Sequence, residues 1–316
     1  MKYLVTGISG FVGAYLFDQL SSKGHDVVGV DAYPLSMPLA LSRFYQMSLM
    51  DQSGIRGVIE QEKPQRIVHL ASASSVGSSW QQPTDCFVNN TNIFLNLIEA
   101  VRLSGLKCRI LSVGSSEEYG PVAASEMPLK EIRPANPMNP YAVARVAQEN
   151  MSRVFAKGYG MDIVCTRSFN HIGPGQTDRF VVSSFVRQAV EVSRGQRPKI
   201  ICGDLDVVRD FVDVRDVIAA YDCILDKGIS GEIYNVCSGQ GVTLRSILER
   251  ICSKVGIPAD FQVDPALIRP IDNPVIIGDN TKLCSLGFAL AYEGLDAAID
   301  GMVVWWQKKL DEGGKG

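Results

Sequence analysis

A serine, a tyrosine and an arginine in this chain have the types and spacing needed to protonate a carbonyl oxygen. Tyr141 and Arg145 are four residues apart in a stretch of helical pattern, so they share one face of that helix. A neutral phenol has a pKa of about 10 and relays protons poorly at pH 7 unless a fixed positive charge stabilises its phenolate. Arg145 can supply that charge, and Ser115 can hydrogen bond to the same oxygen. The alternative is a tyrosine packed at a helix start beside a solvated arginine.

A glycine-rich turn near the N-terminus predicts the group that works with these side chains. An apolar run at residues 3–5 leads into three glycines at every third position, and a helical apolar pattern follows. Such a turn lets backbone N–H groups approach a pyrophosphate, and the N-terminus of the helix favours negative charge. We therefore expect a dinucleotide to bind at Gly7, Gly10, Phe11, Val12 and Gly13.

An acidic residue closes the next apolar run, residues 26–31. Asp31 lies at the position expected to bind the adenosine ribose hydroxyls. A carboxylate there also repels a 2′-phosphate, which favours NAD over NADP. Arg43 lies nearby in the sequence and can accept a phosphate, so NADP remains an alternative. An aspartate in an ordinary turn at the end of a strand is the other interpretation of Asp31.

The order of apolar runs and helical patterns predicts the fold class. Runs at 66–71 and 109–114 are separated by helical patterns at 51–62 and 85–104. This alternation is typical of an α/β protein with a Rossmann-type, doubly wound parallel sheet that helices cover on both faces. Ligands of such sheets bind beyond the carboxyl ends of the strands, which places residues 114–120 at the site.

The same edge of the sheet includes Leu70 and Ala71, which we expect beside the dinucleotide. The sequence predicts a dinucleotide-binding domain in residues 1–165 and a smaller C-terminal α/β substrate lobe in residues 166–312. Some segments of the second part are expected to return to the first domain. Residues 313–316 are expected to form a loose tail.

Polar segments of the second half are expected to contact the substrate. Residues 171–179 are rich in glycine and polar groups and are typical of a binding loop. Residues 203–216 carry two arginines among five acids. We expect neighbouring carboxylates to hold Arg209 and present it to a phosphate; a solvated charged loop is the alternative.

Three further segments are expected to complete the lobe: a strand at 232–237, a helix at 243–255 and the Arg269-Pro270 segment. A last helical pattern is expected at 295–310. The last helical pattern ends with Trp305 and Trp306, which we expect to anchor a core or an interface.

The composition excludes several classes of protein. With 316 residues and a formal net charge of −3, the chain has no basic run of the kind that binds nucleic acid. No apolar run is long enough to span a membrane, and no charged leader with a hydrophobic segment precedes the first strand, so we expect a cytoplasmic protein. The eight cysteines are scattered without paired or His/Cys spacing, so no metal site is expected.

Together, several motifs resemble the extended short-chain dehydrogenases/reductases that act on nucleotide sugars. The motifs are TGISGFVG, HLAS, SVGSSEEYG, YAVAR, RSFNHIGPGQ, VRDFVDVRD and YNVCSG, and they extend over nearly the whole chain. FNHIGPGQ and LIRP are most similar to the branch that acts on GDP-sugars. The resemblance implies hydride transfer from NAD(P)H to the C4 ketone of a GDP-4-keto-6-deoxyhexose, giving a GDP-6-deoxyhexose such as GDP-D-rhamnose, with Tyr141 donating the proton.

The resemblance also implies roles for individual residues and an assembly. Ser115, Tyr141 and position 145 would form the catalytic set, with Tyr141 and Arg145 also touching the cofactor. A homodimer is implied through the helices near 85–104 and 141–159. The residues implied to bind the nucleotide sugar are Asn170, Arg179, Arg209, Arg269 and Asp272.

Three departures from the family pattern keep other functions open. Arg145 stands where the family has lysine, and Ser48 stands where relatives usually have an aspartate near the adenine. Glu117 lies two residues after Ser115, where the dehydratases keep a base for the C5 proton. The alternatives are therefore a GDP-mannose 4,6-dehydratase, a nucleotide-sugar epimerase, or a catalytically silent protein that binds NAD or a nucleotide sugar. The turn reads GFVG rather than the dehydratase GQDG, which favours the reductase.

Overall fold

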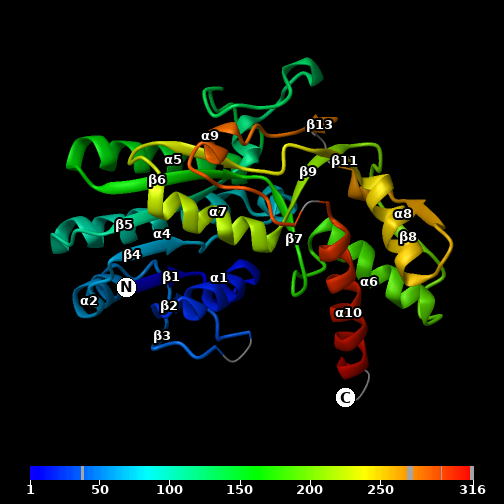
Figure 1. The fold of residues 1–316 in the computed structure, drawn as a ribbon, viewed down its shortest axis with the longest axis horizontal. Coiled ribbons are helices and arrows are strands. Elements are labelled where there is room, and N and C mark those ends of the chain that lie inside the picture. The colour runs from blue at the N-terminus through cyan, green and yellow to red at the C-terminus, as the bar shows by residue number, and fades with distance from the viewer. Residues whose placement is uncertain (37–38, 269–272, 293, 314–316) are drawn as a thin grey trace.

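Seven parallel strands form the main sheet of this protein in a computed structural model, which describes residues 1–36, 39–268, 273–292 and 294–313 (Figure 1). The order across the sheet is β10-β6-β5-β4-β1-β2-β3, and every neighbouring pair is parallel. The strands are β1 (Lys2–Thr6), β2 (Asp26–Asp31), β3 (Arg43–Gln46), β4 (Arg66–His69), β5 (Arg109–Ser115), β6 (Asp162–Ser168) and β10 (Ile233–Val236). The chain winds outward in both directions from β1, and ligands of such sheets bind where the order reverses.

Helices cover both faces of the main sheet (Figure 1). The alternation of side chains along a strand decides which core each residue joins. Tyr3 and Val5 of β1 belong to the core that one pair of helices completes, whereas Leu4 belongs to the core on the opposite face. The first pair is α1 (Phe11–Ser22) and α7 (Val214–Lys227); the opposite helices are α2 (Gln52–Glu62), α4 (Pro83–Ser104) and α5 (Pro140–Tyr159). The expected Rossmann-type α/β class is confirmed.

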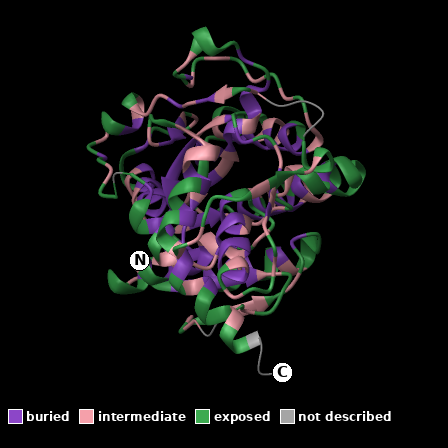
Figure 2. Ribbon diagram, turned by 90° about the vertical axis from the view of Figure 1, so that its right-hand side faces the viewer, coloured by how far each residue is buried: buried purple, intermediate pink, exposed green. Residues whose placement is uncertain are grey.

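A separate core lies in the smaller lobe at the right of Figure 1. Trp306 is buried in this core and donates from Nε1 to the Ser183 hydroxyl at 3.0 Å, while Trp305 packs at its margin. Figure 2 shows buried residues concentrated in the strands of the main sheet and on the helix faces against them. The lobe elements are α6 (Val181–Ser193), α8 (Leu244–Val255), α10 (Asp296–Gly313) and the strand pair β8 (Ile200–Cys202) and β12 (Phe261–Val263).

A four-stranded sheet joins the two parts, with β9 (Val208–Asp213) in its middle. β9 pairs with β7 (Asn170–Ile172), β11 (Gly241–Thr243) and β13 (Val275–Ile276). Residues 208–213 are therefore not the solvated charged loop of the alternative interpretation. Phe211 and Val212 are buried, and the Asp210 carboxylate accepts hydrogen bonds from the Ser238 hydroxyl and the Gly239 amide.

The strand expected in the smaller lobe at residues 232–237 lies elsewhere. It is β10, which extends the main sheet beside β6 and places Ile233 opposite Cys165. This expectation was wrong because an apolar strand pattern does not say which sheet the strand joins. The remaining short elements are α3 (Val76–Gln81), η1 (Ser116–Tyr119), η2 (Ala124–Glu126), η3 (Pro265–Leu267) and α9 (Thr281–Cys284).

The described residues include neither a membrane-spanning helix nor a metal cluster. None of the described helices has both the length and the apolar character needed to cross a bilayer. Within the same residues, no group of His, Cys, Asp and Glu side chains is arranged to hold a metal ion. The cysteines are free thiols, and burial raises the pKa of Cys165 to about 12.

Candidate active site

The start of helix α5 fixes the position of Tyr141. Asn139 precedes the helix, and its side-chain oxygen accepts a hydrogen bond from the Ala142 amide at 2.8 Å. Pro140 occupies the first helical position, where its missing N–H costs nothing. Tyr141 follows in the first turn and is buried. The Asn-Pro sequence before a helical pattern signals such a start, and this signal could have identified Asn139 from the sequence.

Arg145 lies one turn after Tyr141 and is only 4% exposed. Its Nε donates a hydrogen bond to the Tyr141 hydroxyl at 3.1 Å, and its guanidinium carbon lies 5.2 Å from the centre of the tyrosine ring. The two side chains therefore share one helical face, as their spacing predicts. Arg145 is not the solvated arginine of the alternative interpretation.

Strand β5 and Gln148 hold the rest of the Arg145 guanidinium. Nη1 of Arg145 donates to the Val113 carbonyl at 3.1 Å and to the Gln148 side-chain oxygen at 2.7 Å. The Gln148 amide in turn donates to the Ser112 hydroxyl of β5 at 2.9 Å. Gln148 was not among the residues expected at the site, although its position three residues after Arg145 places it on the same helical face.

Ser115 is the last residue of β5 and is buried at the end of the strand where Arg145 binds the Val113 carbonyl. Its hydroxyl oxygen accepts a hydrogen bond from the Glu117 amide at 3.2 Å. The hydroxyl acts there as an acceptor, so its own O–H can donate to a substrate oxygen. Because Arg145 binds the carbonyl of Val113, two residues before Ser115, the fold brings the serine and the Tyr141–Arg145 pair to one end of β5.

Glu117 is joined to the start of helix α5. The Asn139 side-chain amide donates to a Glu117 carboxylate oxygen at 2.9 Å. Asn139 therefore caps the helix that carries Tyr141 and also orients the carboxylate that follows Ser115. The structure thus places Glu117 near the Tyr141 end of α5.

The glycine turn after β1 needs its glycines for steric reasons. Gly7 has a φ of +75°, and a Cβ there would lie 2.7 Å from the Ala71 nitrogen. A Cβ on Gly13 would lie 2.4 Å from the Ile8 oxygen. Gly10 is the N-cap of α1, and among the described residues no side chain caps the first amides of this helix. The turn, with Phe11 at the helix start, therefore fits a bound phosphate group, which would satisfy those amides.

Asp31, at the end of β2, stabilises this turn through hydrogen bonds. Its carboxylate accepts hydrogen bonds from the Ser9 amide at 2.9 Å and from the Tyr33 amide at 3.0 Å. These bonds are those of a turn aspartate, and each carboxylate oxygen keeps a second lone pair for a ribose hydroxyl. Ser48, in the loop after β3, uses its hydroxyl to accept from the Met50 amide at 3.2 Å.

His69 at the end of β4 contacts the end of β1, where the glycine turn begins. It ends β4, is fully buried, and its Nδ1 lies 2.9 Å from the Thr6 hydroxyl at the end of β1. Burial, with a smaller contribution from the positive charge of Arg145, lowers the pKa of His69 to about 3. The imidazole is therefore neutral at pH 7. Because Thr6 immediately precedes the glycine turn and the charge of Arg145 acts on His69, the expected dinucleotide turn and the expected catalytic pair lie at the same edge of the sheet.

The loop expected at 171–179 lies against the beginning of α1. The His171 ring stacks on Phe11 with 6.2 Å between ring centres, and the Tyr15 hydroxyl donates to the Pro174 carbonyl at 2.8 Å. Asn170 is exposed at the start of β7, and Arg179 is exposed just before α6. The loop therefore spans from the glycine turn to the smaller lobe.

Arg209 lies on β9, in the sheet between the two parts. Its Nη1 donates to the carbonyls of Val208 at 2.9 Å and Asn273 at 2.8 Å. Of the acids beside it in the sequence, Asp210 accepts from Ser238, and Asp213 pairs with Arg215. The other two expected substrate contacts, Arg269 and Asp272, lie outside the described residues.

Comparison with known proteins places this geometry in a family. Residues 4–294 match the family model of GDP-mannose 4,6 dehydratase. The chain belongs to this family. It is 32% identical over 283 residues to the GDP-6-deoxy-D-mannose reductase of Pseudomonas aeruginosa, covering 89% of each chain. It is 26% identical to a GDP-mannose 4,6-dehydratase of Yersinia enterocolitica, over 89% of this chain and 87% of the relative.

Solved structures of family relatives have the same fold. The structure of RMD from P. aeruginosa in complex with NADPH superposes with a TM-score of 0.86 at 29% identity, covering 98% of this chain and 99% of that chain. A UDP-glucose 4-epimerase from Thermus thermophilus in complex with NAD gives a TM-score of 0.87 at 28% identity, covering 97% and 99%. The resemblance to the extended short-chain dehydrogenases/reductases of nucleotide sugars is thereby confirmed.

Proposed function

We propose that this family member is an NAD(P)H-dependent ketoreductase of GDP-sugars. It reduces the C4 ketone of a GDP-4-keto-6-deoxyhexose to a GDP-6-deoxyhexose such as GDP-D-rhamnose. The observation that carries the proposal is the buried Tyr141–Arg145 hydrogen bond at the end of β5, beside Ser115. The 32% identity of the chain to a GDP-6-deoxy-D-mannose reductase supports the choice of substrate class.

The catalytic side chains have separable tasks in this proposal. The Tyr141 hydroxyl donates the proton to the ketone oxygen, and the Ser115 hydroxyl donates a hydrogen bond to the same oxygen. Arg145 stabilises the phenolate that remains, through its Nε at 3.1 Å from the phenol oxygen. When bound, the dihydronicotinamide supplies the hydride. Burial of Tyr141 and Ser115 excludes water, which strengthens both interactions as charge develops on the oxygen.

The proposed cofactor site follows the glycine turn and the adjacent strand ends. The residues assigned to it are Gly7, Gly10, Phe11, Val12, Gly13, Asp31, Leu70, Ala71, Tyr141 and Arg145. The described hydrogen bonds of Arg145 use Nε and Nη1, which leaves Nη2 for a cofactor hydroxyl. Asp31 favours NAD by repelling a 2′-phosphate, whereas the P. aeruginosa RMD structure holds NADPH. We propose NAD as the preferred cofactor and NADP as a second one.

The nucleotide sugar is proposed to bind between the dinucleotide domain and the smaller lobe. Asn170 and Arg179 are exposed and available to it, and Arg209 is oriented by two carbonyls. Arginine is the residue suited to paired hydrogen bonds with a pyrophosphate. Arg269 and Asp272 complete the proposed set of substrate contacts.

Dehydration of GDP-mannose is the second candidate activity, and Glu117 is the observation that favours it. The Asn139 amide orients this carboxylate beside the helix that carries Tyr141. A carboxylate so placed is suited to remove a proton from a sugar carbon. The family model itself is that of the dehydratases.

Two incubations separate these activities. In the first, the protein receives a GDP-4-keto-6-deoxyhexose with NADH or NADPH, and we expect loss of reduced cofactor and formation of a GDP-6-deoxyhexose. In the second, it receives GDP-mannose with NAD or NADP, and we expect no 4-keto product. Product in the second incubation alone would replace the reductase by the dehydratase. Tight binding of both ligands without turnover in either would support a silent binding protein.

A homodimer through α4 and α5 is also proposed. These two helices pack side by side, and their outer faces carry exposed apolar side chains, which is typical of an interaction surface. The exposed residues are Phe87, Val88, Leu95 and Leu103 on α4 and Val143, Val154 and Tyr159 on α5. Sedimentation velocity should show a dimer that Val154→Glu converts to a monomer. A native monomer would overturn this assembly.

A further inference from the structure

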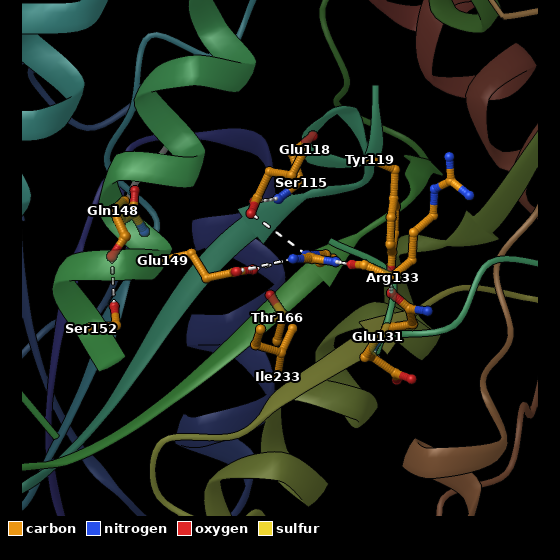
Figure 3. Close-up of polar contacts among 12 residues, drawn as sticks. Ser115, Glu118, Tyr119, Glu131, Arg133, Gln148, Glu149, Ser152, Thr166 and Ile233 are labelled. Carbon is orange, nitrogen blue, oxygen red and sulfur yellow. Dashed lines mark hydrogen bonds and ion pairs between the residues drawn. The ribbon is translucent and has the colours of Figure 1, made fainter. Parts of the chain in front are cut away.

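A buried carboxyl group contacts the main chain of Ser115 (Figure 3). Glu118 of η1 is 0% exposed, and its Oε1 accepts a hydrogen bond from the Ser115 amide at 2.7 Å. A Cβ on Gly114 would lie 2.4 Å from this same oxygen, so the carboxyl packs tightly against the end of β5. The side chain therefore fixes the main chain at the serine that the proposed function makes catalytic.

Ser115 and Glu118 form a capping box in which the glutamate is buried. In a usual capping box the glutamate reaches back along a helix surface in contact with water. Here the second oxygen of Glu118, Oε2, is buried and has no hydrogen-bond donor among the described residues. It lies 3.7 Å from Nε of Arg167 on β6. An ionised oxygen in that position would lack the donors that a buried charge needs.

Arg167 is already committed to a different carboxylate. Its Nε donates to Glu149 Oε2 at 2.8 Å and its Nη2 to Glu149 Oε1 at 3.0 Å, a bidentate pair. Its Nη1 donates to the Arg133 carbonyl at 3.0 Å. One arginine thus faces two buried carboxyl groups, and its charge balances only one of them.

A proton retained on Glu118 removes the second buried negative charge, and the protonated oxygen no longer needs a hydrogen-bond donor. Burial, followed by the nearby Glu149 carboxylate, raises the pKa of Glu118 well above its ordinary value. Glu149 Oε2 lies 2.8 Å and Glu118 Oε2 lies 3.7 Å from the same nitrogen, Nε of Arg167, so a proton retained on Glu118 can be donated to the Glu149 carboxylate. The cluster of Glu118, Glu149 and Arg167 then has zero net charge.

Among the residues that the structure describes, the other groups around this cluster do not supply a second positive charge. Cys165 on β6 is a buried thiol whose pKa is raised to about 12 by burial. The ring of Tyr119 lies 4.5 Å from the Arg167 guanidinium carbon, and its hydroxyl donates to Asn235 on β10 at 2.8 Å. Arg133 contributes its carbonyl, and its own guanidinium pairs with Glu126. Glu131, on the same loop, accepts from the Asn235 amide at 2.8 Å.

We propose that Glu118 is a positioning residue: as a neutral acid sharing its proton with Glu149, it holds the main chain of Ser115 in place for proton transfer. The positioning part rests on the proposed function, because it presumes that Ser115 acts on substrate. The shared proton does not, because it is a property of the folded chain alone.

The shared proton is tested by stability against pH, comparing the full chain with Glu118→Gln. The unfolded chain ionises Glu118 above its ordinary pKa while the folded chain keeps the proton, so rising pH favours unfolding of the native protein. Glutamine has no such proton. From about pH 5 upward, the unfolding equilibrium constant of the native protein should rise relative to the variant, roughly tenfold per pH unit until the folded carboxyl ionises. A constant ratio between about pH 5 and 8 would overturn the shared proton.

A surface substitution provides the control for that comparison. Glu60→Gln removes a carboxyl group whose side chain is 50% exposed on α2. Its unfolding curve should follow the native protein across the same pH range. Urea titrations at each pH, with the same slope for all three proteins, give the equilibrium constants.

The positioning role is tested by two substitutions with opposite expectations. Glu118→Gln keeps an acceptor for the Ser115 amide and a donor for Glu149, so kcat at pH 7 should stay within about twofold of native. Glu118→Met fills the space without an acceptor, so kcat should fall roughly tenfold to a hundredfold while KM for the nucleotide sugar is unchanged. Equal kcat per folded molecule in the Met variant, or equal losses in both, would overturn the role.

The design separates failure of this inference from failure of the proposed function. If the native protein turns over no GDP-sugar, the ketoreductase proposal fails, and the pH comparison still decides the shared proton. Hydrogen exchange at the Ser115 amide then decides the anchoring contact without any turnover. The amide should exchange at least tenfold faster in Glu118→Met than in Glu118→Gln, and equal rates would contradict the contact.

Discussion

Arg145 donates a hydrogen bond from Nε to the hydroxyl of Tyr141 at 3.1 Å, and both side chains are buried on one face of α5. A cation held at this distance stabilises the phenolate left after proton transfer. We therefore expect Tyr141→Phe to lower kcat by about 10²-fold to 10⁴-fold, the usual contribution of a general acid. Dissociation constants for the GDP-sugar and the cofactor should change little, because the ring still fills its space.

Tyr159→Phe on the same helix is the matched control for this prediction. Tyr159 is exposed at the end of α5, away from Arg145, and its loss of a hydroxyl should leave kcat unchanged. Steady-state reduction of the ketone and equilibrium titrations of each ligand provide the measurements. Retained turnover in Tyr141→Phe would remove this phenol from the reaction.

Substitutions of Arg145 test whether the guanidinium serves by its charge or by its shape. Arg145→Lys keeps a cation near Tyr141, but one ammonium cannot reach Tyr141, Val113 and Gln148 in the way the fork does. We expect kcat to fall by less than about tenfold in Arg145→Lys and by at least about 100-fold in Arg145→Met.

Single-turnover kinetics separate the chemical step from ligand binding in these Arg145 variants. A clear rate increase in Arg145→Lys would show that the native arginine slows proton transfer. Equal rates in the lysine and methionine variants would show that the charge at this position has no part in the reaction.

The third prediction concerns Asp31, which we expect to set the preference for NADH over NADPH. Its carboxylate repels a 2′-phosphate and also accepts from the Ser9 and Tyr33 amides. Asp31→Asn removes the charge, so the ratio of kcat/KM for NADPH to that for NADH should rise by about tenfold, or about 1.4 kcal/mol. Stability should fall as well, since an amide NH₂ then faces a backbone N–H. An unchanged ratio would show that the adenosine end lies away from Asp31.

The packing of α1 on the glycine turn gives a fourth prediction. A Cβ on Gly13 would lie 2.4 Å from the Ile8 oxygen, so Gly13→Ala should lower the free energy of unfolding by about 1–3 kcal/mol and weaken cofactor binding. Gly57→Ala is the control, because this residue of α2 has nothing within 4 Å of the added carbon. There we expect an increase of about 0.5–1 kcal/mol. Urea unfolding measures both, and similar effects would contradict the steric argument.

The alternation of strand and helix could be predicted because each pattern is local. The expected helices at 51–62, 85–104 and 243–255 correspond to α2, α4 and α8 within a residue or two. Strand partners are not local, since hydrogen bonding depends on backbone groups that every residue carries. For this reason β10 was assigned to the lobe, and β9 was not recognised inside a charged segment.

Only part of the candidate site could be predicted from the sequence, again because local patterns do not determine contacts between distant segments. Tyr141 and Arg145 share a face because helical spacing alone requires it. Asn139, Gln148 and Glu118 were not assigned to the site. Their spacing places them at a helix start, on the helical face of Arg145 and in a capping box, but it does not show that Asn139 binds Glu117, that Gln148 binds Ser112 of β5, or that Glu118 is buried.

By itself, the sequence determined the glycine turn after the first strand, the strand-and-helix alternation and the shared helical face of Tyr141 and Arg145, since these depend on steric limits and periodicity within short segments. The tertiary structure alone decided that Arg145 is buried and held by Val113 and Gln148. It also decided that Glu118 lies beneath Ser115 beside an arginine already paired with another acid. Burial and charge balance depend on which distant segments meet, and only the folded chain brings them together.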